Sequence, residues 1–440
     1  QPCALVRPAV TPLQTAESHP RSYYAATAKG LEALPPLEGE RRCNVCIVGG
    51  GYTGIATALH LAERGYKAIV VEAKRVGWGA SGRNGGQLSG GQRLDPEALA
   101  GLVGAERARR LWDLGEEAKN LVKRRIAQHA IDCDLKPGII HAGVKPAHAE
   151  AMRRHASFLR DDYGYPHIRP LSREELRALV ASDRYHGGSF DSDAAHLHPL
   201  NYALGLARAA RAAGAEIWEM TPALEITRRD GKPGVRTPQG SVSADFLVLA
   251  CGGHLDRLEP RIAPAIMPIN NFILATAPLG EARARALIAN DAAVADSKYV
   301  IDYYRLSADR RLLFGGGESY RPSYPRDIAG IVRRCMLRVF PQLQDVAVDY
   351  AWGGTLAITL RRLPAFGRLD GDVFYAMGFS GQGVALTTLA GKVIAEAVAG
   401  QAERFDLLAS VPTPNFPGGT LLRWPSLVVG MLYYALRDKL

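Results

Sequence analysis

The sequence lacks the long apolar runs that mark a membrane-spanning protein. No segment approaches the about 18 consecutive apolar residues that a helix needs to cross a bilayer. The longest comparable run extends only over residues 427–436 (LVVGMLYYAL), and the first residues show no charged-then-apolar signal pattern. We therefore expect a protein of the cytoplasm with no integral membrane segment.

Cysteine is scarce, with six in 440 residues, which excludes a small disulfide-stapled scaffold. The only close pair, Cys43 and Cys46, leads into Ile47 and Val48, a pattern typical of a buried strand. Residues three apart in a strand lie roughly 10 Å apart on opposite faces, which is too far for a disulfide. No second pair is present to complete a zinc site, so we interpret both cysteines as strand residues.

A block of basic residues is also missing, although 54 Lys and Arg against 44 Asp and Glu give a formal net charge of +10. The positive charges are scattered among the acids, without the basic–aromatic arrays of nucleic-acid-binding proteins. We expect a solvated basic surface that attracts anions, and no nucleic-acid partner. The length and the 47% hydrophobic content allow two or three domains with their own cores.

The first glycine-rich segment lies between two predicted strands. Residues 44–48 (NVCIV) and 66–72 (YKAIVVE) have strand patterns, and residues 55–64 between them have helical periodicity. In this setting a GxGxxG sequence brings backbone N–H groups and a helix N-terminus to a pyrophosphate. The terminal acid, Glu72, can accept hydrogen bonds from ribose hydroxyls and would repel a 2′-phosphate. The cofactor-binding residues predicted here are Gly49, Gly51, Tyr52, Thr53, Gly54, Glu72 and Ala73.

A second polar, glycine-rich run at residues 75–87 (RVGWGASGRNGGQ) favours FAD over NAD. An NAD enzyme usually continues with another strand and helix at this point, whereas a loop rich in backbone can follow a long cofactor toward its ring. The side chains of Ser81 and Arg83 suit phosphate or ribityl oxygens. Those predicted to meet the polar edge of a flavin are Asn84, Gly85, Gly86 and Gln87.

Distant segments complete the predicted cofactor domain. Residues 200–213 are helical, residues 215–220 form a strand, and residues 244–253 form a buried strand that ends in glycines. Residues 372–383 give a further strand and glycine turn before a helix over 384–399, whose N-terminus can stabilise negative charge on a flavin. These segments add the predicted contacts Ala223, Ala250, Gly252, Gly378, Ser380, Gly381, Gln382, Gly383 and Val384.

Motifs along nearly the whole chain support the same interpretation. They include SYYAATA (22–28), HLHPLN (196–201), IDYYRLSADRRLLFGGG (301–317), RLPAFGRL (362–369) and the tail FPGGTLLRWP (416–425). In these motifs the sequence resembles the D-amino-acid-oxidase-like family of FAD-dependent amine oxidoreductases. The resemblance implies a mixed α/β fold of the p-hydroxybenzoate-hydroxylase-like type, with a discontinuous Rossmann-type FAD-binding domain and an antiparallel-sheet substrate domain.

The domain boundaries expected from this resemblance divide the chain into six parts. Residues 1–40 form an N-terminal arm. The FAD-binding domain takes residues 41–98, 195–260 and 349–440, the last including the tail, and the substrate domain takes residues 99–194 and 261–348.

Two adjacent strands, residues 299–306 and 310–317, are expected to cover the flavin. Because side chains alternate along a strand, Tyr304 shares a face with Asp302, and Arg305 shares the other face with Tyr303. The sequence leaves open which face meets the flavin. The predicted catalytic residues are Tyr304, which could hold an alkylamine by apolar contact and cation–π attraction, and Arg305.

One departure from the family pattern bears on the substrate. Family members that oxidise α-amino acids share a Trp-x-Gly-x-Arg-Pro pattern, in which the arginine grips the substrate carboxylate. Here residues 352–356 (WGGTL) carry leucine at that place. This favours an amine without an α-carboxylate at its reacting end, and the resemblance implies oxidation of gamma-glutamylputrescine to gamma-glutamyl-gamma-aminobutyraldehyde, ammonia and H2O2 in polyamine catabolism. Arg305, Arg361 and Arg362 are candidates for its distant carboxylate, on charge alone.

The alternatives concern the substrate and the electron acceptor. The partners expected are a small-molecule amine and O2, but residues 312–317 lack the lysine that sarcosine-oxidising relatives use with oxygen, which leaves a dehydrogenase open. A different amine or amino acid as the substrate remains open, and so does a flavin-bearing subunit of an assembly or a membrane-associated complex.

Several further expectations concern the cofactor and metal. Relatives with a covalently linked flavin have a histidine near the second glycine-rich loop or a cysteine near the C-terminus. This sequence has Gly79 in that loop and no cysteine after Cys335, so we expect non-covalent FAD. Gln382 stands where relatives often have histidine, which is expected to change hydrogen bonding at the flavin edge. His196 and His198, near Asp191 and Asp193, lack further spaced ligands, and we expect no metal.

Overall fold

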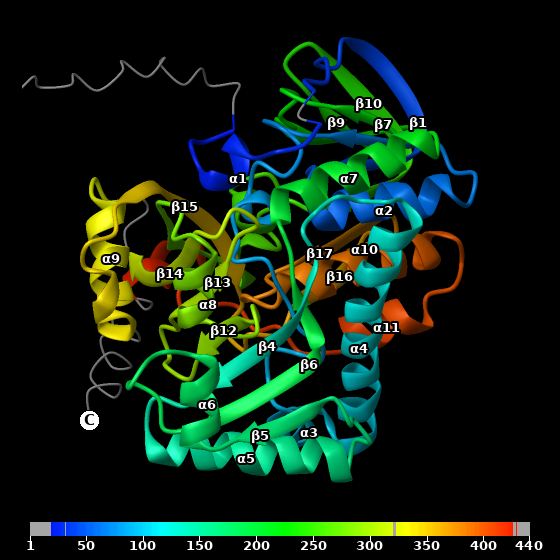
Figure 1. Cartoon of the computed structure of the whole chain (residues 1–440). Coiled ribbons are helices and arrows are strands. Elements are labelled where there is room, and N and C mark those ends of the chain that lie inside the picture. Colours follow the sequence, from blue (N-terminus) through cyan, green and yellow to red (C-terminus); the bar gives the residue numbers. More distant parts are fainter. Residues whose placement is uncertain (1–18, 31, 320–322, 426–427, 429–440) are drawn as a thin grey trace, which may run out of the picture.

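The computed structural model describes residues 19–30, 32–319, 323–425 and 428. Within them the chain forms two sheets (Figure 1). Sheet A has eight strands in the order β16-β17-β10-β1-β2-β7, extended by the hairpin β8–β9. Sheet B has nine strands in the order β15-β11-β14-β13-β12-β4-β6-β3, with β5 paired to β6.

Sheet A is built around five parallel strands, in the order β17-β10-β1-β2-β7. β1 (Gly39–Val48) lies between β10 (Gly240–Leu249) and β2 (Ala68–Val71). Its last residues are apolar and buried on both faces, as is usual for a central parallel strand. Cys43 and Cys46 lie in β1 as buried free thiols, which confirms their interpretation as strand residues. The other strands of this sheet are β7 (Glu216–Trp218), β8 (Glu225–Arg229), β9 (Lys232–Arg236), β16 (Ala365–Leu369) and β17 (Val373–Met377).

Three helices predicted from periodicity pack beside sheet A. They are α2 (Tyr52–Ala62), α7 (Pro199–Ala212) and α10 (Gly383–Val398), and each lies within a few residues of its predicted range. A Cβ at Gly391 of α10 would lie 2.5 Å from the backbone nitrogen of Thr57, so the two helices can approach closely only because this residue is glycine. The long α4 (Ala105–Gln128) runs along α10 and the short α11 (Glu403–Ala409), while α1 (Tyr23–Ala26) contacts α7 (Figure 1).

Sheet B is largely antiparallel. β11 (Met267–Thr276) pairs with both β14 (Leu312–Ser319) and β15 (Val348–Ile358), and β13 (Tyr303–Leu306) joins β14 to β12 (Ala293–Asp296). The sheet is completed by β3 (Gln87–Leu88), β4 (Lys136–Ala142), β5 (Ile168–Leu171) and β6 (Gly188–His196). One of its faces packs on α9 (Ile328–Val339), the yellow helix of Figure 1. Its other helices are α3 (Pro96–Val103), α5 (Pro146–Asp161), α6 (Arg173–Leu179) and α8 (Glu281–Leu287).

Some elements differ from the sequence expectation. Residues 99–120 have a helical pattern in the sequence that predicts one helix. The structure has two there, because Gly104, with a positive φ of 86°, ends α3 and precedes α4. β15 belongs to sheet B, although residues 349–440 were expected in the FAD-binding domain, and β3 also lies in sheet B. The chain crosses between the two sheets next to each of these strands. They belong to sheet B because β15 pairs with β11 and β3 pairs with β6.

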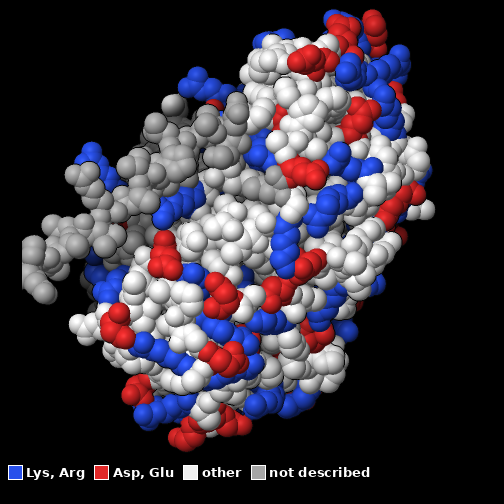
Figure 2. Space-filling view, turned by 45° about the horizontal axis from the view of Figure 1, so that its top comes forward, with Lys and Arg blue, Asp and Glu red and all other residues white. Residues whose placement is uncertain are grey.

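Charges of both signs are mixed on the face of the molecule that is drawn in Figure 2. Lys and Arg lie interspersed with Asp and Glu there. In the described part of the chain, no helix is both long and apolar enough to cross a bilayer. The apolar run at residues 427–436 lies outside the described residues except for residue 428.

Candidate active site

The first glycine loop joins the ends of β1 and β10 to the start of α2. Gly49 has a φ of +112°, and a Cβ there would lie 2.6 Å from the carbonyl oxygen of Ala250. A Cβ at Gly54 would overlap the carbonyl oxygen of Gly49. Neither Gly49 nor Gly54 could carry a side chain, because α2 meets the ends of β1 and β10 at these positions. Gly51 is the N-cap of α2 and provides no side-chain cap, so the first N–H groups of this helix, beginning with Tyr52 and Thr53, suit an anionic ligand.

Glu72 lies at the end of β2, directly beside this loop. Its carboxylate accepts hydrogen bonds from the backbone N–H of Gly50 at 2.6 Å and of Lys74 at 2.8 Å. Burial raises the pKa of Glu72, and these two hydrogen bonds oppose the rise. The structure thus brings the acid to the glycine loop as predicted, whereas Ala73 is exposed beyond β2 and Ala223 is half-buried before β8.

The second glycine-rich segment is fastened to the first. The hydroxyl of Ser81 accepts a hydrogen bond from the backbone N–H of Tyr52 at 3.0 Å, so it stands in for the missing N-cap side chain of α2. Asn84 holds the following turn by donating to the carbonyls of Ala80 and Ser81 and accepting from the N–H of Gly86. A Cβ at Gly51 would lie 3.0 Å from the Ser81 oxygen, so the two segments approach closely at this point.

Arg83 connects the second segment to sheet B. Its Nε donates to the Trp78 carbonyl at 2.6 Å and its Nη1 to the Gly353 carbonyl at 3.2 Å, and its guanidinium lies 4.0 Å from the Trp78 ring centroid. Nη2 is buried and has no hydrogen-bond partner among the described residues. Burial lowers the pKa of Arg83. A buried, unpartnered donor beside the glycine segments fits an oxygen-rich cofactor.

The third glycine turn closes against the second segment. The side-chain amide of Gln382, the N-cap of α10, donates to the Ser89 hydroxyl at 2.9 Å and to the Gly90 carbonyl at 3.0 Å. The Gln87 amide likewise donates to the carbonyl of Val294 at 2.9 Å. The side-chain amides of Gln87 and Gln382, both predicted at the flavin edge, therefore donate hydrogen bonds to backbone carbonyls in this structure. The turn itself contains Gly378, Ser380 and Gly381, all at positive φ, and leads into Gly383 and Val384 at the start of α10.

The face of β13 that covers the second glycine segment carries Tyr303 and Arg305. The Nε of Arg305 donates to the Gly85 carbonyl at 2.9 Å, and a Cβ at Gly85 would lie 2.6 Å from the Tyr303 ring. The ring also lies against Gly315 of β14. The Tyr303 hydroxyl donates to the Asn271 side chain at 2.5 Å. Of the two faces that the sequence left open, the one with Tyr303 and Arg305 is therefore the one that contacts the second glycine-rich segment.

Tyr304 lies on the opposite face and is not brought near the glycine loops. Its ring stacks on Phe314 at 5.2 Å between centroids and meets Phe340 edge-on. Its hydroxyl donates to the Tyr185 oxygen at 3.0 Å, and its side chain is 1% exposed. Because alternate side chains of a strand point to opposite faces, the two predicted catalytic residues are separated by the sheet.

Two residues of this covering face were missed in the sequence. Asn271 of β11 is paired in register with Gly354 of β15 and accepts from Tyr303. The indole Nε1 of Trp352 donates to the Arg83 carbonyl at 3.1 Å. The WGG sequence signalled the tryptophan, but no local pattern marks the asparagine as a site residue.

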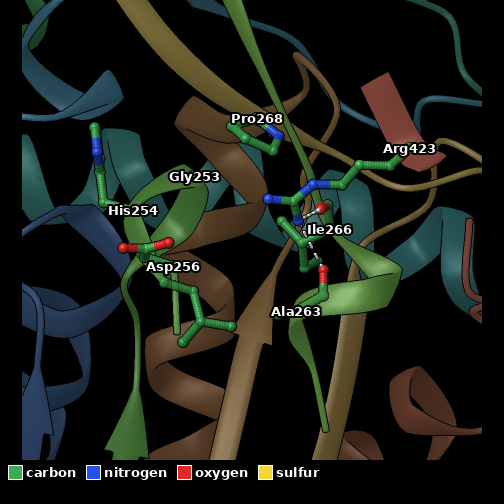
Figure 3. A pocket seen from close by; sticks show the side chains of 8 residues that line it. Gly253, His254, Asp256, Ala263, Ile266, Pro268 and Arg423 are labelled. Carbon is green, nitrogen blue, oxygen red and sulfur yellow. Dashed lines mark hydrogen bonds between the residues drawn. The ribbon is translucent and has the colours of Figure 1, made fainter. Parts of the chain in front are cut away.

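A cavity of about 370 Å³ opens beside the end of β10. It begins just past Ala250 and Gly252 and is lined by Gly253, His254, Asp256 and Pro268 (Figure 3). The tail contributes Arg423, whose Nη1 donates to the carbonyls of Ala263 at 3.1 Å and Ile266 at 2.9 Å. The C-terminal segment thus lines this cavity through Arg423.

The two histidines considered for metal have other partners. The Nε2 of His196 is 2.8 Å from the carbonyl oxygen of Asp291, and Nδ1 of His198 accepts from the N–H of Asn201 at the start of α7. Burial, followed by the charge of Arg305, lowers the pKa of both to about 3. No group of three or more His, Cys, Asp or Glu within the described ranges is placed to hold a metal ion.

A buried carboxyl on β12 leads to a prediction about pH. Asp296 accepts from the backbone N–H groups of Lys298 and Asp302, and burial raises its pKa to about 7, partly opposed by the Lys298 ammonium. The folded protein therefore favours the protonated acid. The stabilisation that this preference gives is complete below pH about 4 and is lost as pH rises through about 7.

Asp296→Asn should make the free energy of unfolding less dependent on pH in that window, with a gain in stability on the order of 2–4 kcal/mol at pH 8. Urea unfolding from pH 4 to 8 measures this. Asp113→Asn, at an exposed site, should leave the profile unchanged, and parallel profiles for Asp296→Asn and wild type would contradict the prediction.

The fold and these contacts describe a two-sheet protein whose glycine-rich turns suit a dinucleotide cofactor. The chain belongs to the DAO family of FAD dependent oxidoreductases, whose family model matches residues 44–397. It is an FAD-dependent enzyme, and its relatives include amine and amino-acid oxidoreductases.

Two known proteins are similar in sequence to this chain over nearly its whole length. The sequence is 41% identical to gamma-glutamylputrescine oxidoreductase of Escherichia coli (strain K12), covering 96% of this chain and 99% of that protein. It is 40% identical to the probable oxidoreductase OrdL of Rhizobium meliloti (strain 1021), covering 95% and 97%. Glycine oxidase from Geobacillus kaustophilus has a similar fold, with a TM-score of 0.72 at 22% identity over 86% of this chain and all of that chain.

Proposed function

We propose that the protein oxidises a primary amine whose reacting end carries no carboxylate, with gamma-glutamylputrescine as the substrate. The observation that carries this proposal is Leu356. It lies on β15 opposite Ile269, on the same face as Gly354 and Trp352, which cover the cofactor segments. An apolar side chain at this place leaves an α-carboxylate without a partner. The 41% identical E. coli relative is named for this substrate.

The chain's own residues account for cofactor binding in this proposal. The predicted residues of the three glycine turns, together with Glu72, Ser81 and Arg83, hold FAD without a covalent link. When bound, FAD supplies the acceptor for the two electrons removed from the carbon that bears the amine. Arg305 positions the second segment through Gly85, and sheet B excludes water from the ring.

Tyr303 and Asn271 hold the amine end of the substrate. The aromatic ring offers apolar contact to the alkyl chain and cation–π attraction to an arriving ammonium, and the hydroxyl–amide pair orients it. The amine loses a proton before oxidation, because only the neutral nitrogen has a lone pair to assist hydride loss. The amine carbon becomes an imine, which water converts to an aldehyde and ammonia, and O2 takes up the two electrons and two protons as H2O2.

The test is product stoichiometry with the purified, FAD-loaded protein in air. Equal amounts of gamma-glutamyl-gamma-aminobutyraldehyde, ammonia and H2O2 are expected from gamma-glutamylputrescine. Absence of the aldehyde would overturn the proposed function. Residues 312–317 of β14 contain no lysine, which favours a dehydrogenase as the second candidate. In that case aldehyde and ammonia would form with little peroxide and only when another electron acceptor is added.

A further inference from the structure

Two arginines from distant segments act on each other electrostatically near one end of the covering face. Arg93 follows β3, and Arg362 lies in the turn after β15, where its N–H donates to the Thr359 carbonyl at 3.1 Å. Burial lowers the pKa of Arg93, and the positive charge of Arg362 is the next cause. The guanidinium of Arg362 also lies 4.5 Å from the ring centroid of Tyr299. The two positive charges thus act on each other, and that of Arg362 lies over an aromatic ring.

Neither guanidinium is paired directly with an acid within the described residues, although the negative charge of Asp95 acts on Arg93. No salt bridge or side-chain hydrogen bond involves Arg93 or Arg362 there. Arg75 and Arg125, in contrast, are each paired with an acid: Arg75 with Glu219 at 2.6 Å and Arg125 with Glu63 at 2.5 Å. Because adjacent, partly desolvated cations repel each other, an anion between them would be bound favourably.

The pair lies at the end of an apolar path that begins at the proposed amine site. Tyr299 and Leu356 pack against one cluster, formed by Met267, Ile269, Ile358 and Phe416. Ile269 is two residues from Asn271 on β11, and Leu356 is two residues from Gly354 on β15, so all four belong to one face. The face therefore runs from Asn271 past Leu356 to Tyr299.

We propose that Arg93 and Arg362, with Tyr299 beneath Arg362, bind the α-carboxylate of the glutamyl group and thereby select a gamma-glutamylated amine over the free diamine. This inference rests on the proposed function. From the reacting carbon to that carboxylate, the substrate has about nine bonds and spans roughly 10 Å when extended. Its methylene groups would lie along the apolar path. Guanidinium groups bind carboxylates in a planar, two-point geometry, so a pair of them distinguishes a carboxylate from an amide.

The negative charge of Asp95, two residues after Arg93 in the sequence, suits the rest of the glutamyl group. Asp95 is exposed, and its negative charge partly opposes the lowering of the Arg93 pKa. A glutamyl end carries an ammonium beside its carboxylate. The carboxylate would meet the arginines and the ammonium would meet Asp95.

The experiment compares Arg93→Met and Arg362→Met with Arg361→Met as the matched control. Arg361 is adjacent in sequence, exposed, and outside the pair. Calorimetry on the FAD-loaded protein measures binding of gamma-glutamyl-n-butylamide, which keeps the carboxylate and lacks the reacting amine. Each pair variant should weaken this binding by about 10- to 100-fold, as expected for a lost hydrogen bond to a charged group. Arg361→Met should bind like the wild type, and Arg362→Lys should fall between.

Kinetics with gamma-glutamylputrescine and with its α-carboxamide separate specificity from general damage. In the wild type the carboxylate form should have the higher kcat/KM, and both pair variants should lose that preference mainly through KM. Thermal unfolding of each variant checks that it is folded. If the folded variants keep both the preference and the binding of the butylamide, the inference is wrong while the proposed function stands. Failure of the wild type to oxidise gamma-glutamylputrescine would instead refute the function, and wild-type binding of the butylamide would still test the arginine pair.

Discussion

Replacement of Gly54 by alanine is expected to yield a folded protein that purifies without FAD. A Cβ at this position would overlap the carbonyl oxygen of Gly49, so α2 must move away from the end of β1. The displacement takes the helix N-terminus out of reach of a pyrophosphate. We expect the affinity for FAD to fall by at least about 1000-fold, which corresponds to about 4 kcal/mol. Titration of the apoprotein with FAD, followed by flavin fluorescence, measures the change.

Gly101→Ala is the control for this prediction. Gly101 lies in α3 with open space around the position of a Cβ. Alanine there should preserve FAD binding and raise stability by about 0.5–1 kcal/mol, because glycine is the poorer helix former. Equal FAD affinity for Gly54→Ala and Gly101→Ala would show that the close approach of helix and strand is not needed for the cofactor.

Replacement of Tyr303 by leucine should lower kcat/KM for the amine by at least about 100-fold, the effect of a reacting group that is misplaced by about 1 Å. The ring covers Gly85 and Gly315, and the hydroxyl donates to Asn271. Without the tyrosine side chain, both the alkyl chain of the substrate and the second glycine-rich segment lose their contact with this residue. Steady-state kinetics with gamma-glutamylputrescine measures this loss, and the thermal stability should change little because Tyr303 is only partly buried.

The matched variant on the other face is Tyr304→Leu, and it should behave in the opposite way. Tyr304 is buried against Phe314 and Phe340, so the shorter side chain leaves a cavity and a destabilisation of about 2–4 kcal/mol. Its kcat/KM at a temperature where it is folded should stay within a few-fold of wild type. A large loss of activity in Tyr304→Leu, with none in Tyr303→Leu, would place the substrate on the α9 side of sheet B and contradict the proposed site.

The cofactor half of the site follows local rules and could be predicted. Gly49 and Gly54 are required by contacts that any strand–turn–helix of this kind makes, and Glu72 is placed by the length of the helix between the strands. The strand positions of Cys43 and Cys46 follow equally from the apolar run around them. Such features depend on neighbours in sequence, so the pattern alone is enough.

The substrate half depends on pairing between distant strands and could not be predicted in the same way. Alternation along residues 299–306 separates Tyr303 from Tyr304, but only the pairing of β13 with β14 and the approach of Gly85 show which face is which. The place of β15 in sheet B follows from its pairing with β11. Arg93 stands in a segment with no motif, and only the fold brings it to Arg362.

The most direct test of the proposed substrate is anaerobic mixing of the FAD-loaded enzyme with gamma-glutamylputrescine, putrescine or glycine, with the flavin absorbance followed in time. Without oxygen, the bleaching rate reports the oxidation of the amine alone. The account predicts that gamma-glutamylputrescine bleaches the flavin much faster than putrescine, and that glycine is the slowest. Equal rates for the three compounds, or fastest bleaching by glycine, would contradict it.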